Sequence, residues 1–237
     1  MSAASRSPAA PVVLVKLCGT ARAEDLDIAY ELSVDLVGFV FFDGSPRRAN
    51  AIDVGAWRRA HGGARTAGPR FAGVFVNAAL DEIARARDAA DLDLIQLHGD
   101  ETPEFCRAVA RIAPVVKAIR LAGPESLAAL DAFDRCHAIL VEPAGTGARG
   151  GAGVPLDLHV AALAARRGRV LLAGGLRPET VAAAIRAVRP YAVDVASGVE
   201  SAPGRRDRTM AAAFVAAARG AIAAVDEPPS EPRGSGA

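Results

Sequence analysis

Short apolar segments alternate with helical patterns along most of this chain, and the alternation repeats eight times. The apolar segments are continuous runs and show no polar and apolar alternation, which is typical of parallel strands that are buried on both faces. The predicted strands are Val12–Lys16, Leu36–Phe41, Phe71–Val76, Leu94–Leu97, Val115–Ile119, Ala138–Val141, Val170–Ala173 and Ala192–Val195.

Between these segments, apolar residues recur at spacings of three and four, which predicts amphipathic helices. The clear ones are Ala23–Leu32, Leu80–Ala90, Thr102–Ala110, Glu179–Val188 and Arg208–Ala218, and the weaker ones are Ala51–Ala60, Glu125–Ala132 and Asp157–Ala165. Side chains that cap helices support two of the starts: Asp100 or Thr102 before Pro103, and Asp157 itself.

Eight strands, each followed by a helix, predict a single-domain α/β fold, the (β/α)8 TIM barrel. The alternative is a doubly wound open sheet, which strand count would distinguish. It is disfavoured because no Gly-x-Gly-x-x-Gly follows the first strand. We expect residues 12–222 to form the barrel, residues 1–11 to be a flexible lead-in, and residues 223–237, rich in Pro, Gly, Ser and Glu, to be disordered.

Composition excludes several classes of protein. The net charge is +1, and no basic stripe is interleaved with aromatic residues, which argues against nucleic-acid binding. Cys18, Cys106 and Cys136 show no paired spacing, so neither a disulfide framework nor a zinc site is expected. No apolar run approaches the roughly 20 residues of a bilayer span, and the N-terminus is no secretory signal. These features predict a cytoplasmic protein without membrane partners.

Functional residues of such barrels lie where the strands end, and Cys18 with Gly19 is the first such position. The simplest interpretation of a lone cysteine is a small buried apolar residue. A thiol has a free pKa of about 8.5, so a Cys18 base would need a positive group nearby. Lys16 is a candidate, because alternation along a strand places Lys16 and Cys18 on one face.

Later strand ends carry further polar side chains. Arg47 follows a turn after the second strand, and it is either a clamp for a carboxylate or a solvated arginine. His98 shares a face with Gln96 and precedes Gly99, which favours a role in substrate binding. No partners recur at metal-ligand spacing, so we expect no metal.

Glu142 ends the sixth strand, where a carboxylate is costly unless it faces a pocket. Pro143 keeps Glu142 extended, and the glycine-rich segment Gly145–Gly153 is interpreted as a mobile loop over the site. Glycine-rich loops follow strands seven and eight, where barrel enzymes bind phosphate. These loops contain Gly174, Gly175, Ser197 and Gly198.

From about Val13 to Arg219 the chain resembles the phosphoribosylanthranilate isomerase family of tryptophan biosynthesis. The motifs that carry the resemblance are Lys-Leu-Cys-Gly (16–19), Gly-Phe-Val-Phe (38–41), Ser-Pro-Arg (45–47), Gly-Val-Phe-Val-Asn (73–77), Gln-Leu-His-Gly-Asp-Glu (96–101), Lys-Ala-Ile-Arg (117–120), Ala-Gly-Gly-Leu (173–176) and Val-Asp-Val-Ala-Ser-Gly-Val-Glu (193–200).

The resemblance implies a TIM barrel that catalyses the Amadori rearrangement of N-(5-phosphoribosyl)anthranilate to 1-(2-carboxyphenylamino)-1-deoxyribulose 5-phosphate, without a cofactor. It implies that Cys18 is the general base and Glu142 the acid. Arg47 would hold the anthranilate carboxylate, and Asp194 would lie beside the aryl amine. The four residues of the glycine-rich loops would bind phosphate.

The chain departs from the family pattern mainly near the acid. Glu142 stands where the family has aspartate, which moves the carboxyl group by roughly 1–1.5 Å. A glutamate still serves as an acid if burial raises its pKa. Gly150–Gly153 lacks the family's hydroxyl, Leu156-Asp157-Leu158 lacks its aromatic residue, and Ala196 replaces a serine. Two alternatives therefore stay open: a relative acting on another phosphoribosyl-linked substrate, and a catalytically silent phosphosugar-binding barrel. The expected partner is a small phosphorylated molecule, and the chain is expected to be a monomer or a homodimer.

Overall fold

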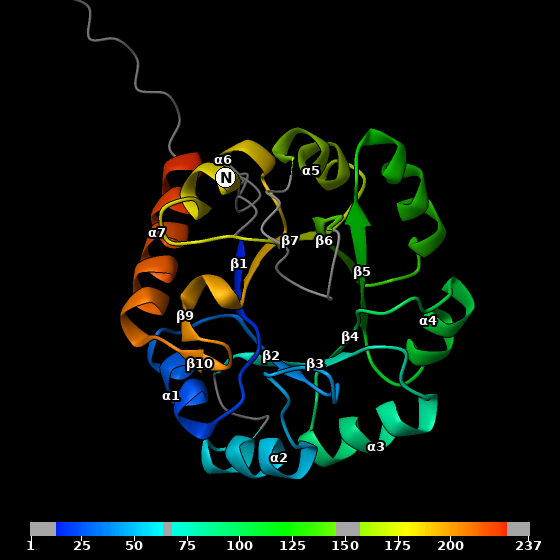
Figure 1. Ribbon diagram of the computed structural model, residues 1–237, viewed down its shortest axis with the longest axis vertical. Helices are drawn as coiled ribbons and strands as arrows, with labels where there is room; N and C mark the ends of the chain where they lie inside the picture. Colours follow the sequence, from blue (N-terminus) through cyan, green and yellow to red (C-terminus); the bar gives the residue numbers. More distant parts are fainter. Residues whose placement is uncertain (1–12, 64–67, 146–156, 227–237) are drawn as a thin grey trace, which may run out of the picture.

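The computed structural model describes residues 13–63, 68–145 and 157–226, and its central feature is a closed barrel of eight parallel strands (Figure 1). The strands are β1 (Leu14–Leu17), β2 (Leu36–Val40), β3 (Arg70–Phe75), β4 (Leu94–Leu97), β5 (Val115–Leu121), β6 (Ala138–Pro143), β7 (Val170–Leu172) and β8 (Ala192–Val195). Each strand pairs with the next along the chain, and β8 pairs with β1. The predicted (β/α)8 barrel is confirmed, and closure excludes the open doubly wound sheet.

Helices surround the barrel on its outer face (Figure 1). They are α1 (Ala23–Glu31), α2 (Ala51–Ala60), α3 (Leu80–Ala90), α4 (Pro103–Val109), α5 (Leu158–Ala165), α6 (Val181–Val188) and α7 (Arg208–Asp226). Thr102, rather than Asp100, caps α4 by accepting a hydrogen bond from the Phe105 amide. Asp157 caps α5 as predicted. Helix α7 continues past the predicted end at Ala218 and into the segment expected to be a disordered tail.

The connection between β5 and β6 differs from the prediction. An α-helix was expected over Glu125–Ala132, but Pro124–Phe133 forms a 3-10 helix, η1. Leu127 and Leu130 are buried, and Phe133 packs against the same core. A spacing of three places these side chains on one face of a helix with three residues per turn. The pattern thus suits the tighter helix.

A small antiparallel ribbon after β8 was not predicted. It follows the short 3-10 turn η2 (Ser197–Val199) and pairs β9 (Glu200–Ala202) with β10 (Arg205–Arg206). The ribbon places Arg206 against the Cys18 carbonyl at the end of β1, and Glu200 against Arg47.

Strand alternation decides what fills the barrel. Leu36, Ala72 and Leu94 form one interior cluster, which Leu14 contacts, and Leu140 and Ala192 belong to a second. Two residues further along β1, β4, β6 and β8 the same face carries polar side chains. These are Lys16, Gln96, Glu142 and Asp194, all buried. The interior is therefore apolar at one end and polar at the end where the strands stop.

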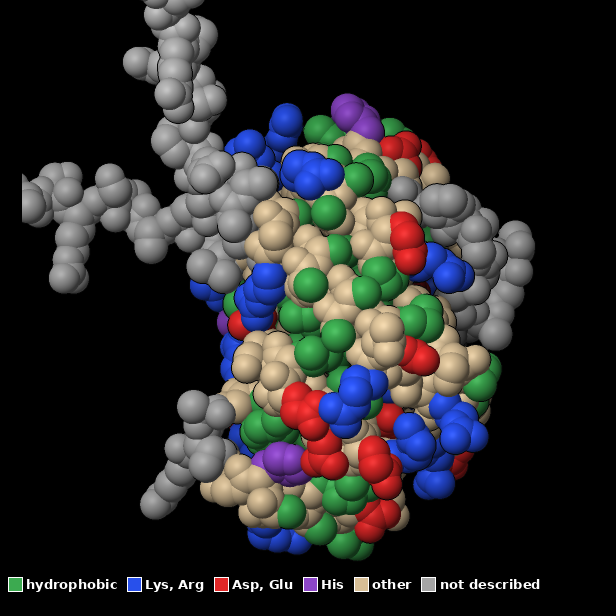
Figure 2. Space-filling view, turned by 90° about the vertical axis from the view of Figure 1, so that its left-hand side faces the viewer, with side chains coloured by type: hydrophobic (Ala, Val, Ile, Leu, Met, Phe, Trp, Pro, Cys, Tyr) green, Lys and Arg blue, Asp and Glu red, His purple; other side chains and the backbone are tan. Residues whose placement is uncertain are grey.

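The outer surface carries charges of both signs. On the face shown in Figure 2, acidic and basic side chains are interspersed among apolar ones. Within the described ranges, no helix is both long and apolar enough to cross a bilayer. The lead-in at 1–11, the end of the predicted tail and the segment 146–156, which covers most of the predicted loop, lie outside the described residues.

Candidate active site

Cys18 lies directly after β1, with its side chain in the barrel mouth and only 8% of its surface exposed. Its amide donates to the Val195 carbonyl at 2.8 Å, which ties the end of β1 to β8. A Cβ atom on Gly38 of β2 would lie 2.6 Å from the Cys18 sulfur and 3.2 Å from Lys16 Cε. Glycine at position 38 therefore makes the room that Cys18 and Lys16 occupy, and the two share a face as predicted.

Lys16 supplies the positive group that a Cys18 base requires. Its Nζ lies 3.0 Å from Asp194 Oδ1, on the strand position paired with it. Burial opposes the charge of Lys16, but Asp194 and Cys18 outweigh it, so its pKa is raised and it stays charged. Burial also raises the pKa of the Cys18 thiol, and the charge of Lys16 only partly offsets this. The thiol is thus protonated in the substrate-free protein.

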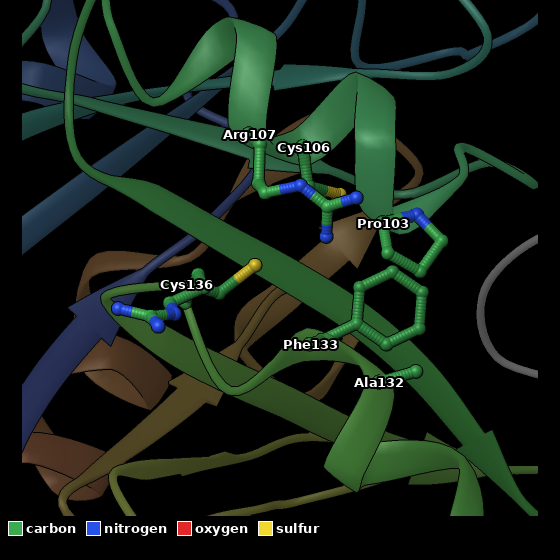
Figure 3. A pocket seen from close by; sticks show the side chains of 7 residues that line it. Pro103, Cys106, Arg107, Ala132, Phe133 and Cys136 are labelled. Carbon is green, nitrogen blue, oxygen red and sulfur yellow. The ribbon is translucent and has the colours of Figure 1, made fainter.

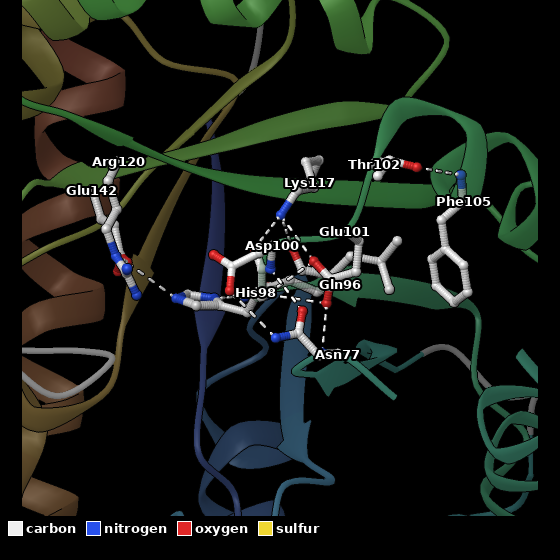
Figure 4. Close-up of polar contacts among 12 residues, drawn as sticks. Asn77, Gln96, His98, Asp100, Glu101, Thr102, Phe105, Lys117, Arg120 and Glu142 are labelled. Atoms are coloured by element: carbon white, nitrogen blue, oxygen red, sulfur yellow. Dashed lines mark hydrogen bonds and ion pairs between the residues drawn. The ribbon is translucent and has the colours of Figure 1, made fainter. Parts of the chain in front are cut away.

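Glu142 and His98 meet at the ends of β6 and β4 (Figure 4). His98 Nε2 lies 3.2 Å from Glu142 Oε1, and Arg120 Nε from β5 lies 3.2 Å from the same oxygen. Burial acts to raise the pKa of Glu142, but the hydrogen bond from His98 and the contacts with Arg120 outweigh it, and the pKa is lowered. An acid role for Glu142 was expected to need a pKa raised by burial. In the substrate-free protein the pKa of Glu142 is lowered, so this condition does not hold.

A buried ion pair supports the loop that carries His98. Lys117 Nζ lies 2.9 Å from Glu101 Oε2 and donates to the Gly99 carbonyl at 2.8 Å. Glu101 in turn accepts hydrogen bonds from the amides of Asn77 and Gly99 (Figure 4). The loop is therefore held by residues of β5 and of the end of β3, and these contacts fix the position of the His98 backbone.

Arg47 is not a solvated arginine, because Glu200 holds it from the β9 ribbon. Nε and Nη2 of Arg47 lie 2.7 Å and 2.6 Å from the two oxygens of Glu200. A Cβ atom on Gly19 would lie 2.5 Å from Arg47 Cδ, so the arginine crosses the chain just after Cys18. Arg47 can therefore receive a substrate carboxylate at the barrel mouth through its remaining N–H groups.

Arg206 is a buried residue that the sequence did not reveal. Its Nη2 donates to the Cys18 carbonyl at 2.8 Å, while Nε and Nη1 have no hydrogen-bond partner among the described residues. Burial lowers its pKa from the usual arginine value. Glu200 could have been suspected from its place in the 193–200 motif, but no local signal marks Arg206.

The loops after β7 and β8 lie against each other. A Cβ atom on Gly198 would lie 1.9 Å from the Leu176 carbonyl oxygen, and one on Gly174 would lie 2.1 Å from Pro143 Cδ. Gly175 and Ser197 are exposed beside them. In the described part of the chain, the amides of Gly174, Gly175, Ser197 and Gly198 donate to no carbonyl oxygen of a turn or loop. The arrangement suits a group that accepts several backbone hydrogen bonds, such as phosphate.

A separate cavity lies between α4 and the turn after η1 (Figure 3). Its lining includes Pro103, Cys106, Phe133 and Cys136, and its volume is about 10 Å³. This is the lower limit for a single water molecule, so the cavity cannot hold a substrate. The predicted site residues all lie elsewhere, at the carboxyl ends of the strands.

The sequence comparisons agree with each other. Residues 15–217 match the family model described as N-(5'-phosphoribosyl)anthranilate (PRA) isomerase. The N-(5'-phosphoribosyl)anthranilate isomerase of Myxococcus xanthus is 45% identical over 213 residues, covering 87% of this chain and 96% of the relative.

Solved structures give the same result. Phosphoribosyl anthranilate isomerase of Thermotoga maritima superposes with a TM-score of 0.81 at 32% identity, over 88% of this chain and 99% of that one. A phosphoribosyl anthranilate isomerase in complex with reduced 1-(o-carboxyphenylamino)-1-deoxyribulose 5-phosphate superposes with a TM-score of 0.77, at the same identity and coverage.

Proposed function

This chain belongs to the N-(5'-phosphoribosyl)anthranilate isomerase family, and we propose that Cys18 and Glu142 are the base and the acid of its reaction. It is an isomerase of tryptophan biosynthesis that rearranges N-(5'-phosphoribosyl)anthranilate to 1-(2-carboxyphenylamino)-1-deoxyribulose 5-phosphate. Neither a different substrate nor a silent barrel is favoured, because similarity to these isomerases extends over nearly the whole barrel.

The reaction requires two proton transfers. Glu142 gives a proton to the ribose ring oxygen as the ring opens, which leaves an imine at the carbon that bears the aryl amine. Cys18 then removes the C2 proton, and the electron pair moves into the imine to form an enolamine, which tautomerises to the ketone. The imine itself accepts the electrons, and the cysteine and the carboxyl group move the protons.

One observation carries the assignment: a continuous set of contacts joins the two groups across the barrel mouth. Cys18 lies beside Lys16, whose Nζ is 2.7 Å from Gln96 Oε1. Gln96 contacts His98 at 3.0 Å, and His98 contacts Glu142. A base and an acid that belong to one connected cluster can serve the two ends of one substrate.

The remaining residues would bind the charged ends of the substrate. Arg47 would hold the anthranilate carboxylate, Asp194 would lie beside the aryl amine, and His98 would contact the sugar. The amides of Gly174, Gly175, Ser197 and Gly198 would bind the phosphate. The bound substrate would exclude water, and its negative charges would repel a carboxylate, so we expect binding to raise the pKa of Glu142 toward the protonated form that an acid needs.

Steady-state turnover of N-(5'-phosphoribosyl)anthranilate by the wild-type protein tests the function. We expect kcat/KM on the order of 10⁴ M⁻¹s⁻¹ or higher, as for typical enzymes. Inorganic phosphate at millimolar concentration should inhibit competitively if the glycine-rich loops bind the phosphate end. An unchanged substrate signal with the wild-type protein would contradict the proposal. The cytoplasmic location, the extent of the domain at 12–222 and the choice between monomer and homodimer stay predictions.

A further inference from the structure

The orientation of the Gln96 amide is set by Lys16. Lys16 is an ammonium group that can only donate hydrogen bonds, and its Nζ lies 2.7 Å from Gln96 Oε1. A rotated amide would place the NH2 group against this ammonium. Lys16 is fully enclosed and is also held by Asp194, so it cannot turn away. The Gln96 oxygen therefore faces Lys16, and the Gln96 NH2 group faces His98.

The amide in turn decides which nitrogen of His98 carries the proton. Gln96 Nε2 lies 3.0 Å from His98 Nδ1, and an amide NH2 group donates only. Nδ1 must therefore accept, which leaves the proton of a neutral imidazole on Nε2. That nitrogen faces Glu142 Oε1 at 3.2 Å and can donate to it.

We propose that Gln96 is a positioning residue, which holds the His98 ring as the tautomer with its proton on Nε2, so that the ring donates to the carboxyl group of Glu142 and orients it. The link to catalysis rests on the proposed role of Glu142 as the acid. Gln96 touches neither the substrate nor the reacting atoms in this scheme, and it acts through His98.

The tautomer follows from the contact on the other ring nitrogen. A second ring proton would lie on Nδ1 and point at the NH2 group of Gln96, and the hydrogen bond between them would be lost. The contacts therefore favour a ring that accepts at Nδ1 and donates from Nε2 to Glu142.

The geometry of the barrel keeps this arrangement rigid. Gln96 lies on β4 with 1% of its surface exposed, and both ends of its amide are bonded within the barrel. The loop after it is fixed by Lys117 and Glu101. His98 thus has one ring nitrogen that faces a fixed donor and one that faces a carboxylate.

The test replaces the donor by an acceptor of the same shape. In Gln96→Glu one carboxylate oxygen keeps the contact with Lys16, and the other faces His98 Nδ1 and demands a proton there. Because Glu142 still accepts from Nε2, we expect His98 to become doubly protonated. ¹⁵N chemical shifts of the imidazole nitrogens in substrate-free protein labelled at histidine report this directly at pH 7.5, and His98→Asn assigns the signals.

In the wild type we expect Nδ1 unprotonated and Nε2 protonated, whereas Gln96→Glu should show both nitrogens protonated. The kcat of Gln96→Glu should fall about 100-fold, because a doubly protonated ring beside Glu142 stabilises its carboxylate form, with KM within threefold. Asn50→Asp adds the same negative charge at the exposed cap of α2, and it should alter neither the His98 signals nor kcat.

A wild-type His98 that is protonated on Nδ1 at pH 7.5 would overturn the proposal, as would unchanged His98 signals in Gln96→Glu. Should that variant fail to fold, the wild-type spectrum alone still decides the tautomer. The spectrum requires no turnover. A wild-type protein with the expected tautomer but no isomerase activity would therefore contradict the proposed function and leave the tautomer assignment standing.

Discussion

The base end and the acid end of the site are built differently, and their surroundings favour opposite ionisation states. Cys18 is enclosed between Lys16, the Gly38 backbone and Arg206 of β10, and burial raises its pKa despite the nearby cation. Glu142 is buried as well, yet His98 and Arg120 keep its pKa low. In the substrate-free protein the base therefore holds a proton and the acid lacks one.

This pair of states is the one that a turnover leaves behind. After one reaction Cys18 has taken the C2 proton and Glu142 has given its own to the ring oxygen. The thiol and carboxylate of the substrate-free protein match that outcome. The form that starts the reaction, thiolate and carboxylic acid, has the same net charge and differs only in where one proton lies. Local fields at the two ends, rather than the total charge, therefore decide how much of the active form exists.

Removal of the base should have the largest effect. Cys18→Ala leaves no group that can take the C2 proton, so kcat should fall by roughly 10³-fold, within the range for general acid–base catalysis, with KM changed much less. Steady-state kinetics measure both constants. Cys136→Ala removes a partly buried thiol that precedes β6, away from the barrel mouth, and should leave kcat unchanged. A Cys18→Ala enzyme within tenfold of the wild type would rule out Cys18 as the base.

Removal of the acid should cost somewhat less, because the ring oxygen can also take a proton from water. Glu142→Gln keeps the shape but cannot donate a carboxylic proton, and we expect kcat to fall about 100-fold. Glu142→Asp retains an acid and displaces it by about 1 Å, so the loss should not exceed that of Glu142→Gln. A rise in kcat for Glu142→Asp would instead mean that glutamate serves a different substrate here.

The contrast between the ends also explains what the sequence could predict. Cys18, Lys16 and Glu142 were identified from strand ends and alternation, because both are local properties of the chain. The lowered pKa of Glu142 could not be predicted from the sequence, because it depends on contacts with His98 and Arg120, which belong to two other strand ends. The same holds for the bidentate contact of Arg47 with Glu200, which joins residues 153 positions apart through an unpredicted ribbon.

The fold itself was easier to predict than its details. Buried runs and helical spacing predict β4, β8, α2 and α3 with their observed bounds. The type of a helix depends on packing, and η1 is an example. Its apolar spacing of three predicted an α-helix, whereas the structure has a 3-10 helix. Arg206 is the extreme case, because its burial against the Cys18 carbonyl follows only from the closure of the barrel.

Substrate anchoring should matter less for kcat than either proton transfer. Arg47→Lys replaces a planar fork by a point charge, so KM should rise about 10-fold, whereas kcat should change less than threefold. Glu200→Gln keeps Arg47 but weakens its orientation, and a smaller rise in KM is expected. A loss confined to kcat in Arg47→Lys would place Arg47 with the base rather than with the substrate carboxylate.

The smallest expected effect is that of pH between 7 and 9. The active form requires Cys18 deprotonated, although its pKa is raised above the ordinary value of 9.0, and Glu142 protonated, although its pKa is lowered below 4.5. Within this interval, one unit of pH increases the thiolate tenfold and decreases the carboxylic acid tenfold, so their product is constant. We expect kcat/KM, which reports the free enzyme, to change less than twofold from pH 7 to pH 9.

Outside this interval, kcat/KM should fall on both the acidic and the basic side. Below the pKa of Glu142 the acid is already fully protonated, and further acid only removes thiolate, so kcat/KM falls. Above the pKa of Cys18 the thiolate is complete, and added base only removes the carboxylic proton, so kcat/KM falls again. The window begins at pH 7 because the substrate phosphate titrates near pH 6. A tenfold change of kcat/KM per pH unit between pH 7 and pH 9 would show that Cys18 or Glu142 titrates in this interval. The pKa values of the two groups would then lie closer together than their surroundings indicate.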